Sequence, residues 1–231
     1  MSGPRCLSWP WRSAGTALAV AVLAWAAVEA RRSAHADDLS RSALSQLQWW
    51  EEDRFVPGPG ERDAVAQRLD EAARLAPDNA ETWEGLGLLE LNHGTGSEAP
   101  ARAVHDFGES IAWRPTSPYT WANLAQARAL AGAPREQVEA AMLTALDVGA
   151  AEPEVQLAVI DLGLAQWPRL APGMRERVAH ALDRMMRRNP YKTLPVVLAR
   201  DHLELACPYV HRDARLARTV WPRRCRDLGA A

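Results

Sequence analysis

The chain has 231 residues, of which 48% are hydrophobic but only 6% aromatic, and its formal net charge at pH 7 is −2. This length allows one domain or one short repeat array, and the near-neutral charge argues against a general nucleic-acid-binding protein. Many Ala and Leu residues with few Val, Ile and Thr runs favour helices over strands. Lys192 is the only lysine among 27 Lys and Arg residues, which indicates a compositional bias rather than phosphate recognition.

The N-terminal segment predicts a membrane anchor. Basic residues flank an uncharged apolar run, residues 14–28, an order typical of exported proteins. Fifteen residues are short for a spanning helix, which needs about 20, so a cleaved signal peptide is the open alternative. Trp9 and Trp11 precede the run, as aromatic residues do at a membrane interface, and favour a retained anchor. Residues 1–36 are therefore predicted to form a cytoplasmic tip and a membrane helix, with the rest of the chain in the periplasm.

Two helices are expected between this anchor and residue 76. Asp37 or Asp38 would cap the first of them, whose apolar residues have the spacing of an amphipathic helix. The Pro- and Gly-rich residues 57–60 end it. A second amphipathic helix then runs up to Pro77. This pair is interpreted as a degenerate first unit of a repeat array.

A repeat is visible in the spacing of the prolines. Four of them recur at intervals of 38, 38 and 37 residues: Pro77, Pro115, Pro153 and Pro190. Trp83 and Trp121 each stand six residues after a proline, and Trp-x-x-Leu-Gly returns as Trp-x-x-Leu-Ala. A fixed period of this length predicts stacked units that cannot bury their apolar faces alone. Residues 37–190 are therefore expected to form tandem repeats, about four helix pairs in all.

Within this array, each pair is expected to break at a turn rich in Gly or Pro. The connectors lie at residues 92–97, 132–134 and 167–173, and Pro134 suits the first turn of the following helix. Residues 191–231 are more polar and are predicted to form two capping helices, with a turn at Cys207 and Pro208.

The positions of the three cysteines indicate which of them would reach an oxidising compartment. Cys6 precedes the apolar run, whereas Cys207 and Cys225 lie far beyond it. If the chain is exported, only these last two reach an oxidising compartment, where a disulfide between them would contribute about 3 kcal/mol. Two unpaired buried thiols, or a zinc site completed by His202 and His211, are the alternatives. The disulfide is the prediction, and no metal or cofactor is expected.

The residues of the repeat resemble the tetratricopeptide family. The residues that match its pattern in order are Trp83, Leu86, Gly87, Ala103, Phe107 and Pro115, and then Trp121, Leu124, Ala125, Gly132, Ala141, Ala145 and Pro153. The resemblance implies an all-α, tetratricopeptide-like solenoid of helical hairpins behind the N-terminal membrane helix. It also implies a repeat core that includes Trp83, Gly87, Phe107, Trp121 and Leu124.

On the same template, exposed positions of the first helix of each unit line a partner-binding groove. Here these positions are Glu81, Glu84, Leu88 and Asn92 in one unit, and Tyr119, Ala122, Gln126 and Ala129 in the next. The alternative is that these side chains only face water. The chain departs from the chaperone-binding members of the family, whose clamp needs lysines that this sequence lacks.

A narrower resemblance concerns function. Residues 114–125, 152–157 and 163–167 are similar to segments of VpsP-type, membrane-anchored polysaccharide biosynthesis proteins. This implies a periplasmic scaffold that binds the proteins of a membrane assembly for exopolysaccharide synthesis or export. The sequence contains no motif for nucleophilic, phosphate or metal chemistry, so no catalytic residues are predicted.

A second class of function remains open on the sequence alone. Six arginines gather near the C-terminus, where they would suit an acidic glycan or lipid headgroups: Arg212, Arg215, Arg218, Arg223, Arg224 and Arg226. The alternative to the scaffold is therefore a periplasmic glycan-binding module that uses this cap. A solvated helix face would explain the same residues.

Overall fold

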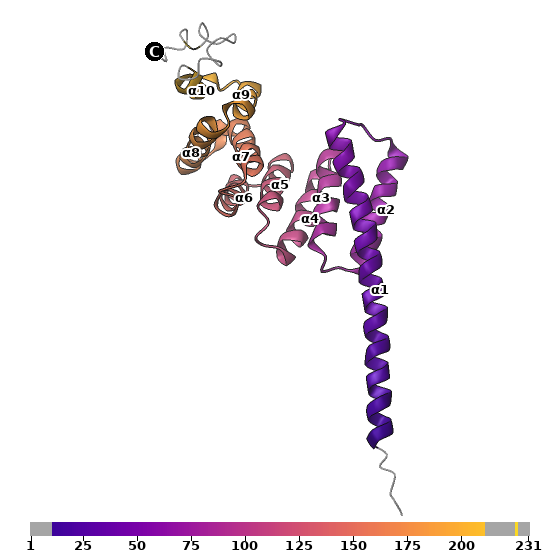
Figure 1. Ribbon diagram of the computed structural model, residues 1–231. Coiled ribbons are helices and arrows are strands. Elements are labelled where there is room, and N and C mark those ends of the chain that lie inside the picture. The colour runs from indigo at the N-terminus through magenta and orange to yellow at the C-terminus, as the bar shows by residue number, and fades with distance from the viewer. Residues whose placement is uncertain (1–10, 211–224, 226–231) are drawn as a thin grey trace, which may run out of the picture. The chain divides into compact units, whose positions relative to one another are not determined.

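The computed structural model describes residues 11–210 and residue 225 (Figure 1). This part of the chain contains ten α-helices and one short 3-10 helix, and no strand. The all-α class predicted from composition is confirmed. The chain divides into two compact units, Met1–Gly85 (unit 1) and Leu86–Ala231 (unit 2). Helix α3 (Ala80–His93) begins in the first and ends in the second.

Helix α1 (Trp11–Glu52) is one continuous helix of 42 residues. Asp37 and Asp38 lie in its middle, so the expectation that one of them caps a new helix is wrong. The physical reason is local, because no Gly or Pro occurs between residues 16 and 56 to interrupt the hydrogen-bond ladder. The predicted anchor and the predicted first repeat helix are therefore one helix.

The two halves of α1 differ in packing. The C-terminal half packs on α2 (Pro59–Leu75), and Ala36, Ala43, Leu47 and Trp50 are all buried. Residues 15–35 contain no buried side chain, and Figure 1 shows this half of α1 running beyond the end of α2. Among the residues that the structure describes, no helix has both the length and the apolar character needed to cross a membrane.

The start of α3 completes unit 1 through small side chains. Ser40 Oγ and Thr82 Oγ1 lie 2.6 Å apart and are buried, so each satisfies the other. A Cβ atom at Gly85 would lie 3.0 Å from side-chain carbons of both Leu44 and Leu69. Glycine at this position therefore lets α3 approach α1 and α2 closely.

Unit 2 contains the remaining helices in hairpin order: α4 (Ala99–Trp113), α5 (Pro118–Leu130), α6 (Arg135–Val148), α7 (Pro153–Ala165), α8 (Pro172–Arg188), α9 (Pro190–Ala199) and α10 (Leu203–Val210). Consecutive helices pack together, and α5 also contacts α7, α7 contacts α9 and α6 contacts α8. One buried core runs from Ala103 in α4 to Ala206 in α10. The packing is that of successive helical hairpins.

Three of the periodic prolines follow the end of a helix. Ala76, Arg114 and Asn189 each precede a proline, and their N–H groups bond the carbonyl four residues earlier at 2.8, 2.9 and 2.7 Å. Proline disfavours the helical conformation of the residue before it, so the helix ends there. The last of these three prolines is also the first residue of α9. Pro153 only begins a helix, α7, because α6 already ends at its Gly149 C-cap. The periodic prolines therefore mark helix ends at some positions and helix starts at others.

One expected turn lies elsewhere, and at the expected turn of residues 132–134 the position of one proline differs. Cys207 and Pro208 are inside α10, and the chain reverses at Asp201 instead. Asp201 has a φ of 59°, a left-handed conformation in which aspartate is more common than most residues, and this ends α9. Pro134 is the N-cap of α6 rather than a residue of its first turn.

Candidate functional site

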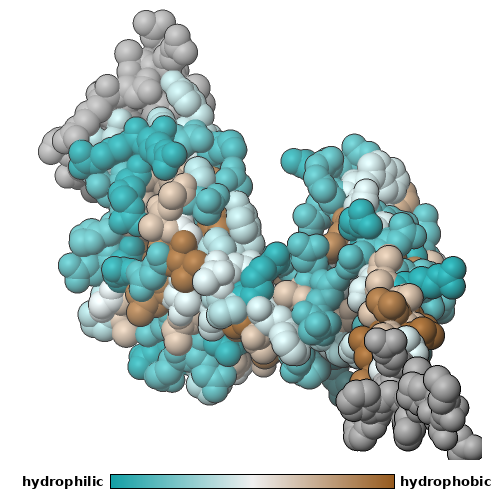
Figure 2. Space-filling model, turned by 60° about the horizontal axis from the view of Figure 1, so that its bottom comes forward, coloured by the Kyte–Doolittle hydropathy of each residue, from teal (hydrophilic) through white to brown (hydrophobic). Residues whose placement is uncertain are grey.

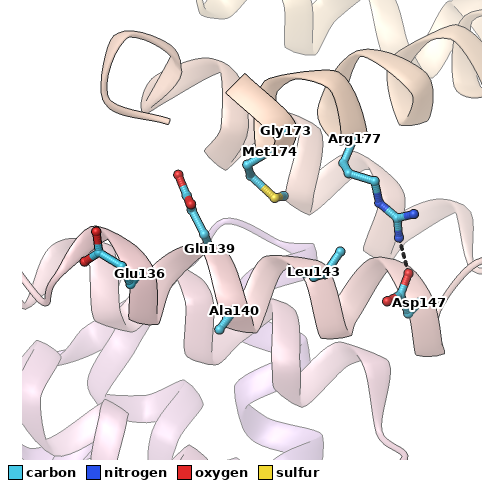
Figure 3. A pocket seen from close by; sticks show the side chains of 8 residues that line it. All are labelled: Glu136, Glu139, Ala140, Leu143, Asp147, Gly173, Met174 and Arg177. Carbon is cyan, nitrogen blue, oxygen red and sulfur yellow. Dashed lines mark hydrogen bonds and ion pairs between the residues drawn. The ribbon is translucent and has the colours of Figure 1, made fainter. Parts of the chain in front are cut away.

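A groove lies between α6 and α8 of unit 2 (Figure 3). Its first section has a volume of about 600 Å³. Helix α6 contributes Glu136, Glu139, Ala140, Leu143 and Asp147, and α8 contributes Gly173, Met174 and Arg177. The α6 residues recur every three or four positions and so lie on one face of that helix.

The floor of this first section is apolar. Leu143 is 40% exposed although it is a large aliphatic residue, and Met174 is buried beneath the groove. Ala140 has only a methyl group and Gly173 has no side-chain carbon, so neither residue fills the space between the helices. Leu143 can therefore pack against an apolar side chain of another molecule in this hollow.

Glu139 holds the N-terminal end of the groove together. Its Oε1 accepts a hydrogen bond of 2.6 Å from the backbone N–H of Ala171, the N-cap residue of α8. Its carboxylate thereby satisfies a donor that would otherwise be unpaired at the helix start. Glu136 remains exposed, and its own backbone N–H, together with the Arg135 guanidinium, keeps the pKa of its carboxyl below the ordinary value.

The groove continues beyond an ion pair between Arg177 and Asp147. These two residues also line a second hollow of about 430 Å³, with His180 and Arg184 of α8. Arg184 in turn lines a third hollow of about 370 Å³, together with Arg187 and Arg188. The lining thus changes from acidic at the start of α6 to basic at the end of α8.

Arg184 is held in place by a buried amide. Gln156 of α7 is 3% exposed, and its Oε1 accepts a hydrogen bond of 3.0 Å from Arg184 Nη2. The Gln156 Nε2 donates to the carbonyl of Gly149 at 3.1 Å. His180 and Arg188, one turn to either side of Arg184, have no hydrogen-bond or ion-pair partner among the described residues. Arg188 is therefore available to an external anion, whereas His180 already interacts electrostatically with the Asp183 carboxylate.

The residues of the predicted groove lie elsewhere. Glu81 and Glu84 belong to unit 1, whereas Leu88, Asn92, Tyr119 and Gln126 belong to unit 2, and none of them lines the three hollows just described. Glu81, Asn92, Tyr119 and Gln126 are exposed, and Glu84, Leu88 and Ala129 are half-buried.

Two of these positions have a specific environment. Ala122 is buried, which corrects the expectation that it faces the groove, because α5 packs against both α4 and α6. The Tyr119 hydroxyl donates a hydrogen bond of 3.1 Å to Glu152, the N-cap residue of α7. Burial and this contact raise the pKa of Tyr119 above its ordinary value. Tyr119 therefore already links two hairpins.

The predicted core residues occupy two environments. Phe107 and Leu124 are buried, and a Cβ atom at Gly87 would lie 2.6 Å from the Phe107 ring, so only glycine fits there. Trp83 and Trp121 are only half-buried. Each indole instead donates a hydrogen bond to the carbonyl of the proline six residues earlier, at 2.7 and 2.8 Å.

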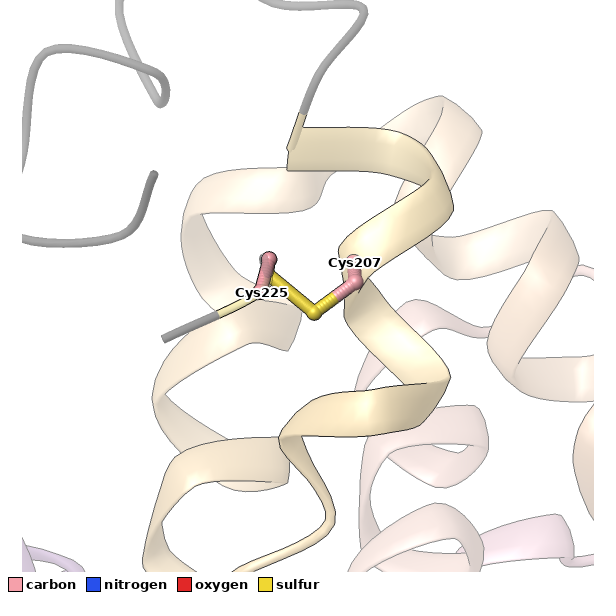
Figure 4. Close-up of a disulfide and its surroundings, with 2 residues drawn as sticks. All are labelled: Cys207 and Cys225. Atoms are coloured by element: carbon pink, nitrogen blue, oxygen red, sulfur yellow. A yellow bond between two sulfur atoms is a disulfide. The ribbon is translucent and has the colours of Figure 1, made fainter. Parts of the chain in front are cut away.

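The expected cysteine pair is joined in the structure (Figure 4). Cys207 and Cys225 form a disulfide and both are buried. His202, the first imidazole of the alternative zinc site, contacts Glu204 and the Leu164 carbonyl instead. Among the described residues, no group of three metal-ligating side chains is close enough to bind a metal ion. His211 and the six C-terminal arginines lie outside the described residues.

The α6–α8 groove is absent from the sequence-based predictions, which considered only the first helix of each pair. A signal for it was present, since His180, Arg184 and Arg188 recur every four residues along α8. The chain matches no protein-family model and no curated protein sequence.

Proposed function

We propose that the protein is a tetratricopeptide-like scaffold, tethered to a bacterial inner membrane by α1, that binds partner proteins in the periplasm. The partners belong to a membrane assembly that synthesises or exports an exopolysaccharide. In this account the protein performs no chemistry. Its helical hairpins present surfaces, and the tether raises the concentration of those surfaces near the partners.

The observation that carries the scaffold proposal is a repeated turn. The hydrogen bonds from Trp83 to Pro77 and from Trp121 to Pro115 have the same atoms, the same six-residue offset and nearly the same length. The helices that follow also start alike, with Asn79 and Ser117 accepting bonds from backbone N–H groups of the first turn. Such recurrence supports a repeat unit of about 38 residues, and repeat proteins of this kind mostly bind other molecules.

The N-terminal half of α1 supports the tether. Six large apolar residues there are more than half exposed: Leu18, Val20, Val22, Leu23, Trp25 and Val28. Their spacing distributes them around the whole circumference of the helix. A helix that is apolar all round requires an apolar environment, and a bilayer supplies one. An apolar stretch shorter than the hydrocarbon core is accommodated by local thinning and by flanking arginines that reach the interface.

The periplasmic location is supported by the disulfide. Disulfides persist in oxidising compartments such as the periplasm and are rare in the cytosol. The pairing of Cys207 with Cys225 is therefore consistent with export of unit 2. The polysaccharide assignment is supported by the resemblance of residues 114–125 and 152–157 to VpsP-type proteins.

Vesicle flotation tests the tether. The full-length chain should float with vesicles of phosphatidylethanolamine and phosphatidylglycerol. Leu23→Asp should reduce the floating fraction strongly, because a carboxylate at the centre of an inserted helix costs about 3 kcal/mol. Val56→Asp is the matched control, because Val56 is 87% exposed but lies after α1. Flotation that is equal for both variants would contradict the tether.

Deletion of the gene in the parent bacterium tests the role in polysaccharide assembly. The deletion strain should release less exopolysaccharide, and the wild-type gene should restore the yield. The Leu23→Asp variant should not restore it, whereas Val56→Asp should. Unchanged polysaccharide in the deletion strain would contradict this part of the proposal.

A further inference from the structure

We propose that the α6–α8 groove binds an amphipathic helix of a protein partner, with carboxylates of that helix facing Arg184 and Arg188. This inference rests on the proposed scaffold function and adds the binding surface and the chemistry of the partner. The partner helix packs apolar side chains on Leu143, which lies between these arginines and Glu136.

Neighbouring hollows along α8 share lining residues. The first and second hollows share Asp147 and Arg177, and the second and third share Ala150 and Arg184. The first two hollows lie between α6 and α8, and the third continues along α8 beside Ala150, Ala151 and the start of α7, so that together they follow α8 from Gly173 to Arg188. At 1.5 Å per residue this is roughly 22 Å, or about four helical turns. An apolar helix face in a groove between two helices is a recurrent mode of peptide recognition.

The two ends of the groove carry opposite charge. At the basic end, Arg184 is oriented by Gln156, and His180 and Arg188 have no hydrogen-bond or ion-pair partner among the residues described. Along one row of α8, His180 and Arg184 line the second hollow, and Arg184 and Arg188 line the third. At the opposite end the exposed charge is the carboxylate of Glu136. The complementary ligand carries carboxylates at one end only.

The first hollow of the groove has an apolar section around Leu143. Leu143 is exposed between these charged ends. On the face that Figure 2 draws, hydrophobic patches are separated by hydrophilic surface. An acidic glycan offers no side chain to cover Leu143, and no aromatic residue lines the described hollows to stack on a sugar. Phosphate headgroups of lipids would meet Glu136 and Glu139 as well as the arginines. A helix with apolar and acidic segments fits both sections.

Photo-crosslinking in membranes of the parent bacterium tests the proposal. A photoreactive amino acid is placed in the full-length chain at Leu143 or Arg188, in the groove. Positions for comparison are Gln126, on the predicted α5 surface, and Arg169, which is exposed between α7 and α8. The two groove positions should crosslink to one protein, and mass spectrometry should map both adducts to one segment. Its acidic residues should lie at the Arg188 adduct.

Other results overturn the proposal and distinguish its failure from that of the scaffold function. Adducts with lipid or glycan, or adducts with two unrelated proteins, would contradict a partner helix in the groove. Protein adducts from Gln126 without any from Leu143 or Arg188 would disprove the groove and leave the scaffold function standing. If none of the four positions gives a protein adduct, both proposals fail.

Binding of a synthetic peptide with the mapped sequence measures the charge contribution. Arg184→Glu and Arg188→Glu should each raise the Kd at least tenfold, an effect typical of reversing one member of a close charge pair. Arg169→Glu should leave the Kd unchanged. Arg188 has no described intramolecular partner, so its substitution should leave the fold intact. Replacing peptide carboxylates by lysine should restore binding to the Glu variants, and equal Kd values for Arg188→Glu and Arg169→Glu would contradict the proposal.

Discussion

The two halves of α1 have the same secondary structure and opposite surroundings. Trp50, in the C-terminal half, is 1% exposed, and Trp25, in the N-terminal half, is 68% exposed. In the C-terminal half the apolar residues recur on one face and are covered by unit 1. In the N-terminal half they surround the helix, and no side chain that the structure describes covers them. The difference teaches that burial by a partner, and not residue type, decides what an apolar side chain contributes to stability.

The largest expected effect compares these two tryptophans directly. Trp50→Ala should lower the free energy of unfolding by about 3–5 kcal/mol, because it leaves a cavity in the α1–α2 interface. Trp25→Ala should change it by less than about 0.5 kcal/mol, since no described side chain covers Trp25. Guanidinium unfolding of the full-length chain in detergent, followed by circular dichroism, measures both. Equal losses would break the comparison.

Removal of the disulfide should have the next largest effect. Cys207→Ala combined with Cys225→Ala should lower the free energy of unfolding by about 3 kcal/mol, because the loop of 18 residues is no longer closed in the unfolded chain. The same unfolding experiment measures it. Reduction of the wild-type protein should produce the same loss, and a double variant as stable as the oxidised protein would contradict the prediction.

Substitution of the half-buried tryptophans should lower the free energy of unfolding by less than Trp50→Ala does and by more than Trp25→Ala does. Trp83→Phe and Trp121→Phe keep an aromatic ring and remove the indole donor to Pro77 or Pro115. Each should cost about 1 kcal/mol, the usual net contribution of one hydrogen bond. Similar values are expected because the two turns have the same geometry. Clearly unequal losses would show that the two turns are not equivalent units.

Exposed ion pairs should have the smallest effect, and it should depend on pH. Hydrogen bonds from Arg187 and then Tyr209 hold the pKa of Asp183 below its ordinary value. A lowered pKa in the folded state adds stability above about pH 4, the ordinary aspartate pKa, and this stability disappears as the pH falls through the folded-state pKa. Asp183→Asn should therefore flatten the acid limb of a plot of unfolding midpoint against pH. Parallel curves for variant and wild type would contradict this.

Local features of the fold could be predicted from the sequence. Proline after a helix end and tryptophan six residues later are short-range signals, and the structure places hydrogen bonds at both. The close approach of Gly87 to Phe107 follows from the same repeat pattern. The continuity of α1 was missed because Asp37 and Asp38 looked like a helix start, although only a Gly or Pro would have broken the ladder.

The α6–α8 groove could not be predicted in the same way. Periodicity identifies the apolar face of one helix, but it does not say which exposed faces of two helices meet. Leu143 and Arg184 are 41 residues apart in the sequence and become parts of one groove only when α6 and α8 pack in successive hairpins. The role of Gln156, which is buried and orients Arg184, also depends on that packing.

Thiol labelling in the parent bacterium tests the central claim, a membrane-tethered chain with its hairpins in the periplasm. A Gln126→Cys variant carries one added thiol on the exposed surface of α5. After the outer barrier is opened, a membrane-impermeant maleimide should label this introduced thiol in the inner-membrane fraction. Cys6, on the opposite side of the apolar run, should react only when the inner membrane is also permeabilised. A chain in the soluble fraction, or labelling of both thiols only after inner-membrane permeabilisation, would contradict the account.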